Sequence, residues 1–150
     1  SGACGKPSYQ APEMHSDVEY DAFLADAFSL GVVLFGVAMK DYPWGSTKPD
    51  SCALFKYVQR LGLRKFLEKR RVRNGAPDEH LMDVMSPALA TLLEGLLQTE
   101  PQKRFTLGES CFDHAGSQTS VWDAEWLSGD GSVGAHGVFC RSGSNPLAGG

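Results

Sequence analysis

The longest apolar segment of the chain is Phe23–Met39, in which apolar residues occupy every face of a helix and Asp26 is the only charged residue. A helix that is apolar all round must be buried, either in a protein core or in a membrane. Its uninterrupted apolar part, Ala27–Met39, is shorter than the ~20 residues that a membrane span needs. The charged residues Lys40 and Asp41 follow at once. The pattern therefore predicts one buried central helix, around which other helices pack.

Further segments carry apolar residues at helical spacing, so the chain is predicted to be mainly α. Residues 51–66 predict one helix whose buried face carries Leu54, Tyr57, Val58, Leu61 and Phe66. Residues 78–84 form a second amphipathic segment. Ser86 and Pro87 suit the cap and the first position of a third helix, which continues to Leu97. Aromatic residues of the segment Ser120–Leu127 are expected to close the last part of the core.

Length and composition predict one modest domain, because the chain has 150 residues and 42% of them are hydrophobic. The net charge of -4 argues against a general nucleic-acid binder. No C-x-x-C pair is present, which predicts reduced thiols in a cytoplasmic protein rather than a metal site or disulfides. The cysteines are Cys4, Cys52, Cys111 and Cys140. Since the chain begins at Ser1 with no leader, we expect a fragment of a longer protein.

Four short segments combine proline, glycine and charged residues in a way that periodicity does not explain. Residues 5–13 (loop 5–13) read Gly-Lys-Pro-Ser-Tyr-Gln-Ala-Pro-Glu, and residues 26–32 read Asp-Ala-Phe-Ser-Leu-Gly-Val. Residues 41–44 read Asp-Tyr-Pro-Trp, and residues 100–109 read Glu-Pro-Gln-Lys-Arg-Phe-Thr-Leu-Gly-Glu. In this order they resemble the helical lower half of the large lobe of eukaryotic protein kinases, where the first element reads Gly-Thr-x-x-Tyr-x-Ala-Pro-Glu.

The resemblance implies a serine/threonine kinase, since tyrosine kinases usually have Trp at the position of Tyr9. The Pro-Trp turn at residues 43–44 is loosely similar to the calcium/calmodulin-dependent group. In the family, loop 5–13 receives the substrate residue that follows the phosphoacceptor. The substrate-loop residues of this chain would be Gly5, Lys6, Pro7 and Tyr9.

The resemblance also implies a set of structural anchors. In the family, the carboxylate of Glu13 pairs with Arg104, and Asp26 receives hydrogen bonds from the backbone of the catalytic loop. An acid that enters a core needs such donors. Glycine lowers helix propensity by about 1 kcal/mol relative to alanine, so Gly31 and Gly36 are expected where neighbouring backbone comes close. The anchor residues are Ala11, Pro12, Glu13, Asp26, Gly31 and Arg104.

The helix near residues 53–66 is a docking surface for substrates and regulators in many kinases. Candidate docking residues are Tyr57, Arg60, Arg64 and Lys65. The segment Arg64–Arg73 is strongly basic and has Glu68 as its one acid. Its basic residues suit an acidic docking partner or a nuclear-import signal. They also suit a solvated helix end, where cations meet the negative end of the helix dipole.

Protein kinases transfer phosphate with parts that precede the Ala-Pro-Glu element: a Gly-rich loop, a strand Lys, an H-R-D loop and a D-F-G magnesium ligand. None of these occurs in the chain, so ATP and Mg²⁺ are expected only for the full-length parent, with its missing N-terminal part. The chain alone is expected to be inactive and to bind no metal or cofactor. Lys6 replaces the usual Thr of the loop, and Gly36 offers no acid that would select Arg before the phosphoacceptor.

The expected organisation is a partial kinase domain at residues 1–127 and a Gly/Ser-rich, disordered tail at residues 128–150. Without its N-terminal part, the central helix should expose apolar surface. The expected partner is a protein substrate or regulator, with neither nucleic acid nor membrane. The alternative function is a non-catalytic interaction module derived from a kinase.

Overall fold

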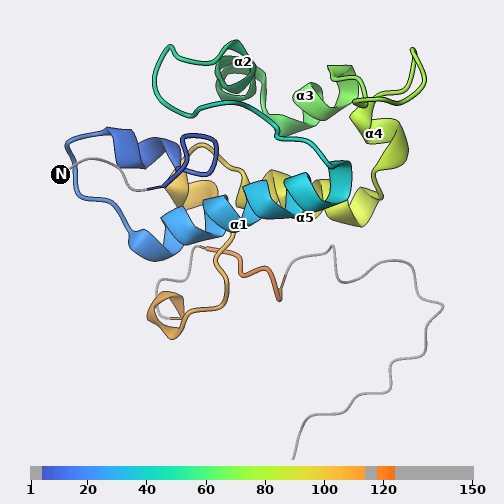
Figure 1. Cartoon of the computed structure of the whole chain (residues 1–150). Coiled ribbons are helices and arrows are strands. Elements are labelled where there is room, and N and C mark those ends of the chain that lie inside the picture. Colours follow the sequence, from blue (N-terminus) through green and yellow to red (C-terminus); the bar gives the residue numbers. More distant parts are fainter. Residues whose placement is uncertain (1–4, 114–117, 124–150) are drawn as a thin grey trace, which may run out of the picture.

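The computed structural model describes residues 5–113 and 118–123 (Figure 1). Helices dominate this part of the chain, which contains no named strand; Arg71 and His80 form an antiparallel bridge, and Thr106 and Ser120 a parallel one. The prediction of a mainly α fold is confirmed for these residues. The elements are η1 (Pro12–His15), α1 (Ala22–Met39), α2 (Ala53–Leu61), α3 (Leu63–Lys69), α4 (Leu81–Val84), α5 (Pro87–Leu96), η2 (Pro101–Lys103) and η3 (Ser110–Phe112).

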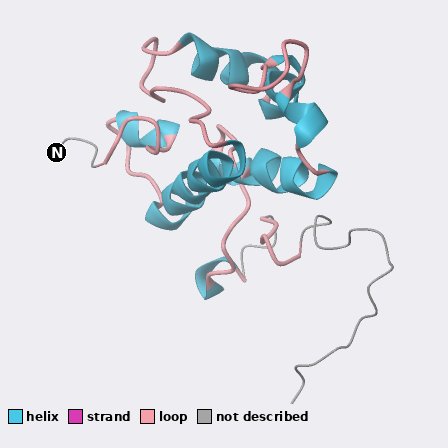
Figure 2. Cartoon of the chain, turned by 45° about the vertical axis from the view of Figure 1, so that its right-hand side comes forward, coloured by secondary structure: helices cyan, strands magenta, loops and turns pink. Residues whose placement is uncertain are grey.

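Helix α1 lies in the middle of the molecule in both views (Figure 1 and Figure 2). The carboxylate of Asp21 begins the helix by accepting hydrogen bonds from the backbone N–H groups of Phe23 and Leu24. The helix ends at Lys40, which adopts the left-handed conformation. Helix α1 packs against α5, while α3 contacts α2, α4 and α5. The prediction of one central core helix is therefore confirmed.

By length and composition alone, α1 could cross a membrane. The expectation that this segment is too short for a membrane span was therefore too strict. The core helix of a soluble protein passes the same test, and one such helix is weak evidence for a membrane protein. The side chains of Phe28, Val32 and Phe35 are completely covered by the rest of this chain. That packing is the behaviour of a core helix.

An aromatic cluster joins α1 to the segment that follows it. The rings of Phe28 and Trp44 are stacked with their centroids 5.9 Å apart, and Phe55 of α2 meets Trp44 edge-on at 4.9 Å. All three side chains are buried. A second, smaller cluster lies on the α5 side of α1 and contains Ala27, Leu92, Leu96 and Val121. The core thus extends on two sides of α1.

The helix predicted for residues 51–66 is divided into α2 and α3 at Gly62, whose φ of +86° breaks the helical path. Its buried face was predicted correctly for Val58 and Phe66 but wrongly for Leu54 and Leu61. Phe55 and Val58 are buried, whereas Leu54 and Leu61 are 42% and 46% exposed. The reason is that Phe55 packs in the aromatic cluster. This orientation of α2 leaves Leu54 and Leu61 on its exposed face. The helix predicted at 78–84 forms only over Leu81–Val84.

Within the described part of the segment predicted to close the core, an aliphatic residue is buried, and Trp122, the one predicted aromatic described there, is not. Val121 is buried, whereas Trp122 is 67% exposed. The Trp122 indole N–H donates to the carbonyl of Leu107 at 3.1 Å. Trp126, Leu127 and the predicted disordered tail at 128–150 lie outside the described residues.

The two glycines of α1 differ in their surroundings. A Cβ atom at Gly31 would lie 2.7 Å from Cδ2 of Leu97 and 3.0 Å from Cβ of Leu96. The expected close approach is present there, although side-chain atoms make it. At Gly36 the nearest atom beyond the helix is the carbonyl oxygen of Asp41, at 3.8 Å. The expectation of a close neighbour was therefore wrong for Gly36.

We expect Gly31→Ala to destabilise the fold by ~1–3 kcal/mol, because its methyl group would overpack the contact between α1 and α5. Gly36→Ala serves as the matched control in the same helix. It should raise the free energy of unfolding by up to ~1 kcal/mol, since alanine has the higher helix propensity and room exists for it. Urea unfolding of both variants measures the difference. Effects of the same sign would contradict the packing described for Gly31.

Candidate functional site

Loop 5–13 is held by hydrogen bonds from the turn that follows α1. The indole N–H of Trp44 donates to the carbonyl of Ser8 at 3.0 Å, and this bond is buried. The hydroxyl of Thr47 donates to the carbonyl of Gln10 at 2.6 Å, and its backbone N–H donates to the carbonyl of Pro7 at 3.2 Å. These contacts were not anticipated from the sequence, because a single Thr in a loop carries no periodic signal. They fix the loop against the core.

Helix α1 holds the same loop from its other side. The hydroxyl of Ser29 donates to the carbonyl of Tyr9 at 2.8 Å. The ring of Tyr9 meets the ring of Tyr42 edge-on, with centroids 5.8 Å apart. A side-chain hydrogen bond with Tyr42 and partial burial raise the pKa of Tyr9 above its ordinary value. The phenol of Tyr9 is therefore a weaker acid than an ordinary tyrosine, and its hydroxyl is engaged with Tyr42.

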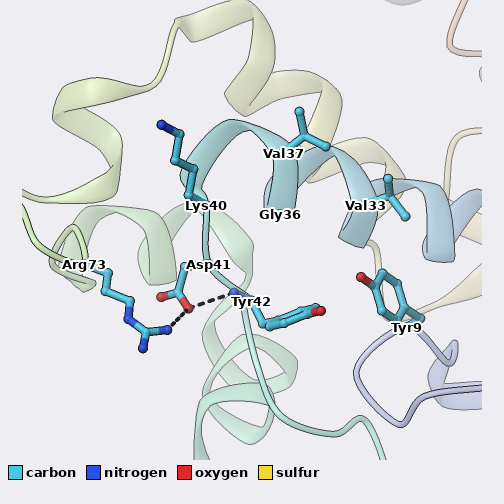
Figure 3. A pocket seen from close by; sticks show the side chains of 8 residues that line it. All are labelled: Tyr9, Val33, Gly36, Val37, Lys40, Asp41, Tyr42 and Arg73. Atoms are coloured by element: carbon cyan, nitrogen blue, oxygen red, sulfur yellow. Dashed lines mark hydrogen bonds and ion pairs between the residues drawn. The ribbon is translucent and has the colours of Figure 1, made fainter.

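Three cavities border loop 5–13. The first, of about 370 Å³, has Tyr9 and Tyr42 at one side and the Asp41–Arg73 pair at the other (Figure 3). Tyr42 also lines a second cavity of about 410 Å³, together with Lys6, Pro7, Ser8, Trp44, Gly45, Leu54 and Arg70. The third, of about 290 Å³, lies beside Gly5 and Asp26. The loop thus presents Lys6, Pro7 and Tyr9 next to open space.

The expected Glu13–Arg104 pair is present and buried. The guanidinium of Arg104 donates to the two carboxylate oxygens of Glu13 at 2.5 and 3.0 Å. It also donates to the carbonyls of Leu24 and Gln98, at 2.7 and 3.0 Å. Arg104 is completely buried and lies over the ring of Phe28, with its central carbon 5.0 Å from the ring centroid. Ala11 and Pro12 lead directly into this contact, and Ala11 is itself fully buried.

Asp26 does not enter the core as expected. It is exposed and accepts no hydrogen bond from the residues that the structure describes. It stands at the start of an exposed line along α1, in which Leu30, Val33 and Val37 follow at helical spacing and are 38%, 42% and 74% exposed. We call these three residues the α1 stripe. The predicted exposure of apolar surface on the central helix is therefore observed.

The predicted docking residues differ in their contacts. Arg64 donates to Glu94 of α5 at 2.8 Å, and Lys65 pairs with Glu68 at 3.3 Å. Arg60 is exposed. Tyr57 is half-buried against the main core, and its hydroxyl has no hydrogen-bond partner among the described residues. Of the four, Arg60 is the one that is exposed with no ion pair in the described part.

The basic segment 64–73 contains a structural residue that the sequence did not single out. Arg70 donates to the carbonyls of Pro43 and Tyr42 and to the carboxylate of Asp41. Arg73 pairs with the other oxygen of Asp41 at 3.1 Å. The side chains of Arg70 and Asp41 are only 19% and 17% exposed. Arg70 therefore fixes the turn at residues 41–44. This structural role differs from the two roles predicted for the basic segment, docking of an acidic partner and a solvated helix end.

Two further side chains near the loop have shifted pKa values. Burial, and then the charge of Lys48, lower the pKa of His15, whose Nε2 lies 2.9 Å from the hydroxyl oxygen of Thr47. Burial acts to raise the pKa of the Cys52 thiol, but backbone N–H groups, foremost that of Phe55, outweigh it and lower the pKa. Cys52 and Cys111 are free thiols. Within the described ranges, no group of His, Cys, Asp and Glu side chains could hold a metal ion.

We expect Arg104→Met to cost about 3–5 kcal/mol of stability, because it leaves the buried carboxylate of Glu13 without its partner. Arg64→Gln is the matched control, since the Arg64–Glu94 pair is exposed and such pairs contribute at most ~1 kcal/mol. Arg104→Lys keeps the charge but loses the planar fork, so its loss should be intermediate. Urea unfolding measures all three. Equal losses for Arg104→Met and Arg64→Gln would contradict the role given to the pair.

His15 should make stability depend on pH. Its folded pKa lies below the unfolded value of 6.5, so the unfolded chain binds more protons below that pH. The stability that neutral His15 contributes is complete above about pH 6.5 and is lost as the pH falls through its folded pKa. His15→Gln should therefore flatten the melting temperature against pH in the range below about 6.5. An unchanged slope would contradict this assignment.

The four segments lie within the part of the chain that matches a known family. Residues 1–115 match the family model of the protein kinase domain. The serine/threonine-protein kinase ppk27 of Schizosaccharomyces pombe is 39% identical over 39% of this chain, and serine/threonine-protein kinase chk1 of the same yeast is 26% identical over 69%. Tribbles homolog 2 of Bos taurus is 27% identical over 95%. The matched regions cover 15%, 18% and 34% of these relatives. Because the family model covers most of its residues, the chain belongs to the protein kinase family.

Proposed function

We propose that this chain is the substrate-side, C-terminal part of the catalytic domain of a serine/threonine protein kinase. The intact domain would transfer phosphate from ATP to Ser or Thr of a protein. The observation that carries the proposal is the placement of loop 5–13. The Glu13–Arg104 pair fixes one end of the loop in the core, and Lys6, Pro7 and Tyr9 remain beside open cavities. A rigid, accessible loop is what a substrate peptide needs.

Within this proposal, Gly5, Lys6, Pro7 and Tyr9 receive the substrate residue after the phosphoacceptor. Three residues position the loop, because each donates a hydrogen bond to one of its backbone carbonyl groups: Ser29, Trp44 and Thr47. Such bonds leave the side chains of Lys6 and Pro7 beside the second cavity. The substrate would therefore be read by the side chains of the loop and of the turn at residues 41–44.

The chemistry of phosphate transfer would come from a kinase part that precedes loop 5–13 in sequence, with ATP and Mg²⁺. We propose that this part covers the α1 stripe and donates hydrogen bonds to Asp26. Full burial of a Leu or Val side chain stabilises by about 1.5–3 kcal/mol, so covering the stripe would supply a sizeable share of the interface energy. The exposure of Leu30, Val33 and Val37 supports this arrangement.

We place the protein in the cytoplasm, with a protein substrate or regulator as partner and with neither nucleic acid nor a membrane. The free thiols of Cys52 and Cys111 are consistent with a reducing compartment. The net charge of -4 is unfavourable for binding a nucleic-acid backbone. The burial of Phe28, Val32 and Phe35 favours a core helix over a membrane span.

A second candidate function is a non-catalytic docking module. The observation that favours it is the outer face of α2, where Leu54 and Leu61 lie seven positions apart and are both exposed. Exposed Arg60 adjoins Leu61. Two apolar side chains on one helical face can enter a groove of a partner. This function needs no ATP site.

The intact protein should phosphorylate Ser or Thr peptides, whereas the 150-residue chain alone should show no saturable binding of ATP with Mg²⁺. Phosphate transfer to peptides and calorimetric titration with ATP measure the two properties. Saturable ATP binding by the chain alone would contradict the proposal that the ATP site lies in the preceding kinase part. An intact protein that transfers no phosphate but binds partners through α2 would favour the docking module.

Asp26→Asn gives a sharper test of the covering part. In the chain alone Asp26 is exposed, so the substitution should change its free energy of unfolding by no more than about 0.5 kcal/mol. In the intact protein it should lower both stability and transfer rate, because the donors to the carboxylate lose their acceptor. Equal effects in both proteins would count against the arrangement.

A further inference from the structure

The second cavity beside loop 5–13, of about 410 Å³, lies where the loop meets the turn after α1 and the first turn of α2. These segments contribute Lys6, Tyr42 and Leu54 to its wall, and we call it the Lys6 cavity. Neither Asp26 nor any residue of the α1 stripe lines it. The kinase part that is proposed to cover the α1 stripe therefore leaves the Lys6 cavity open to a ligand.

Lys6 is the cation of this wall that is available to a ligand. It is exposed and forms no ion pair within residues 5–113 and 118–123. Arg70, the other cation, is already engaged, because it donates to two backbone carbonyl groups and to the carboxylate of Asp41. No acid is among the described residues that line the cavity. A carboxylate is therefore the group that would complement it.

Much of the remaining wall is apolar. The side chains of Leu54 and Tyr42 are 42% and 46% exposed, and Pro7 is exposed as well. Burial of methylene groups against such side chains favours binding. Gly45 adds no side chain, and a Cβ atom placed on it would meet no atom within 4 Å beyond its chain neighbours. The cavity therefore has room for a side chain that is apolar along its length and charged at its end.

We propose that the Lys6 cavity binds a glutamate side chain of the protein substrate. Its carboxylate pairs with Lys6, and its methylene groups pack against Pro7 and Leu54. The inference rests on the function proposed above, in which loop 5–13 receives the substrate residue after the phosphoacceptor, and it names the chemistry of that residue. It also joins α2 to the substrate loop, because Leu54 belongs to the same wall as Lys6.

Two other kinds of side chain complement this wall less well. A phosphate dianion is held best by several converging donors or by a guanidinium fork, and the fork of Arg70 is already occupied. An apolar side chain such as leucine would cover the ammonium group of Lys6 without giving it a partner, which is unfavourable for a charged group. Glutamate satisfies both the cation and the apolar wall.

The test measures peptide binding to the intact protein by fluorescence anisotropy, independently of phosphate transfer. The labelled peptides differ only in the residue that follows a central Ser, which is Glu, Gln, Leu, Lys or phosphoserine. Gln is the matched control for Glu, because it has nearly the same shape without the charge. Lys6→Gln removes the cation of the cavity, and Lys69→Gln is its control, since Lys69 is exposed but does not line the cavity.

Helix α2 supplies a second matched pair. Leu54 and Leu61 are exposed to a similar degree, 42% and 46%, but only Leu54 lines the cavity. Leu54→Ala and Leu61→Ala therefore separate the Lys6 cavity from a docking surface that would use the whole outer face of α2. Thermal melts monitored by circular dichroism establish that each variant keeps the fold of the intact protein.

The Glu peptide should bind about two- to fivefold more tightly than the Gln peptide, the factor that an exposed ion pair gives. Lys6→Gln should remove this difference and Lys69→Gln should keep it, as a double-mutant cycle requires of two interacting groups. Leu54→Ala should weaken the binding of both peptides by at least about twofold, whereas Leu61→Ala should leave it unchanged. The Leu, Lys and phosphoserine peptides should bind less tightly than the Glu peptide.

Equal affinity for the Glu and Gln peptides would overturn the inference, and this comparison needs no variant. Tighter binding of the Leu, Lys or phosphoserine peptide, or a Glu preference that survives Lys6→Gln, would overturn it too. Equal effects of Leu54→Ala and Leu61→Ala would move binding to the outer face of α2 and count against the cavity.

The cavity and the kinase function can fail separately. A Glu preference that depends on Lys6, in a protein that transfers no phosphate, would remove the proposed kinase function but keep the ligand of the cavity. Phosphate transfer without that preference would keep the kinase function and remove the ligand.

Discussion

The structure depends on how the charge of Arg104 is kept out of water. A fully buried cation is costly unless its donors are satisfied, and the guanidinium meets this condition by reaching three separate parts of the chain. Glu13 provides the opposite charge, while the carbonyls of Leu24 and Gln98 accept the remaining bonds. The start of α1, the segment after α5 and the end of loop 5–13 therefore share one ion. None of them can move without disturbing the others.

Apart from the Glu13–Arg104 pair, three residues outside the loop hold it through its backbone carbonyl groups. Trp44, Thr47 and Ser29 each donate to a carbonyl group of the loop. Arg70 in turn fixes the turn that carries Trp44, through carbonyl groups and Asp41. Because these three bonds use backbone carbonyl groups, the side chain of Lys6 can vary without loss of the scaffold, whereas that of Glu13 cannot.

The central helix could be predicted from the sequence because its apolar pattern is long and needs no partner to be recognised. The Glu13–Arg104 pair came from the resemblance to kinases, since its two residues are 91 positions apart and no local pattern joins them. Predictions failed where tertiary packing chose between similar residues. Phe55 took the buried position that Leu54 was expected to fill, and Gly62 divided the helix. The anchoring role of Arg70 was hidden because it lies in a run of basic residues.

The spacing of these contacts along the chain also sets an order of assembly. Loop 5–13 is made before its partners, since Trp44 and Thr47 lie 36 and 37 positions further on from Ser8 and Gln10, and Arg104 lies 91 positions beyond Glu13. Closing such long loops carries an entropic cost before any contact rewards it. The surface that meets a partner therefore acquires its final shape only after residue 104 has left the ribosome, and a chain stopped before that residue has the loop but not its conformation.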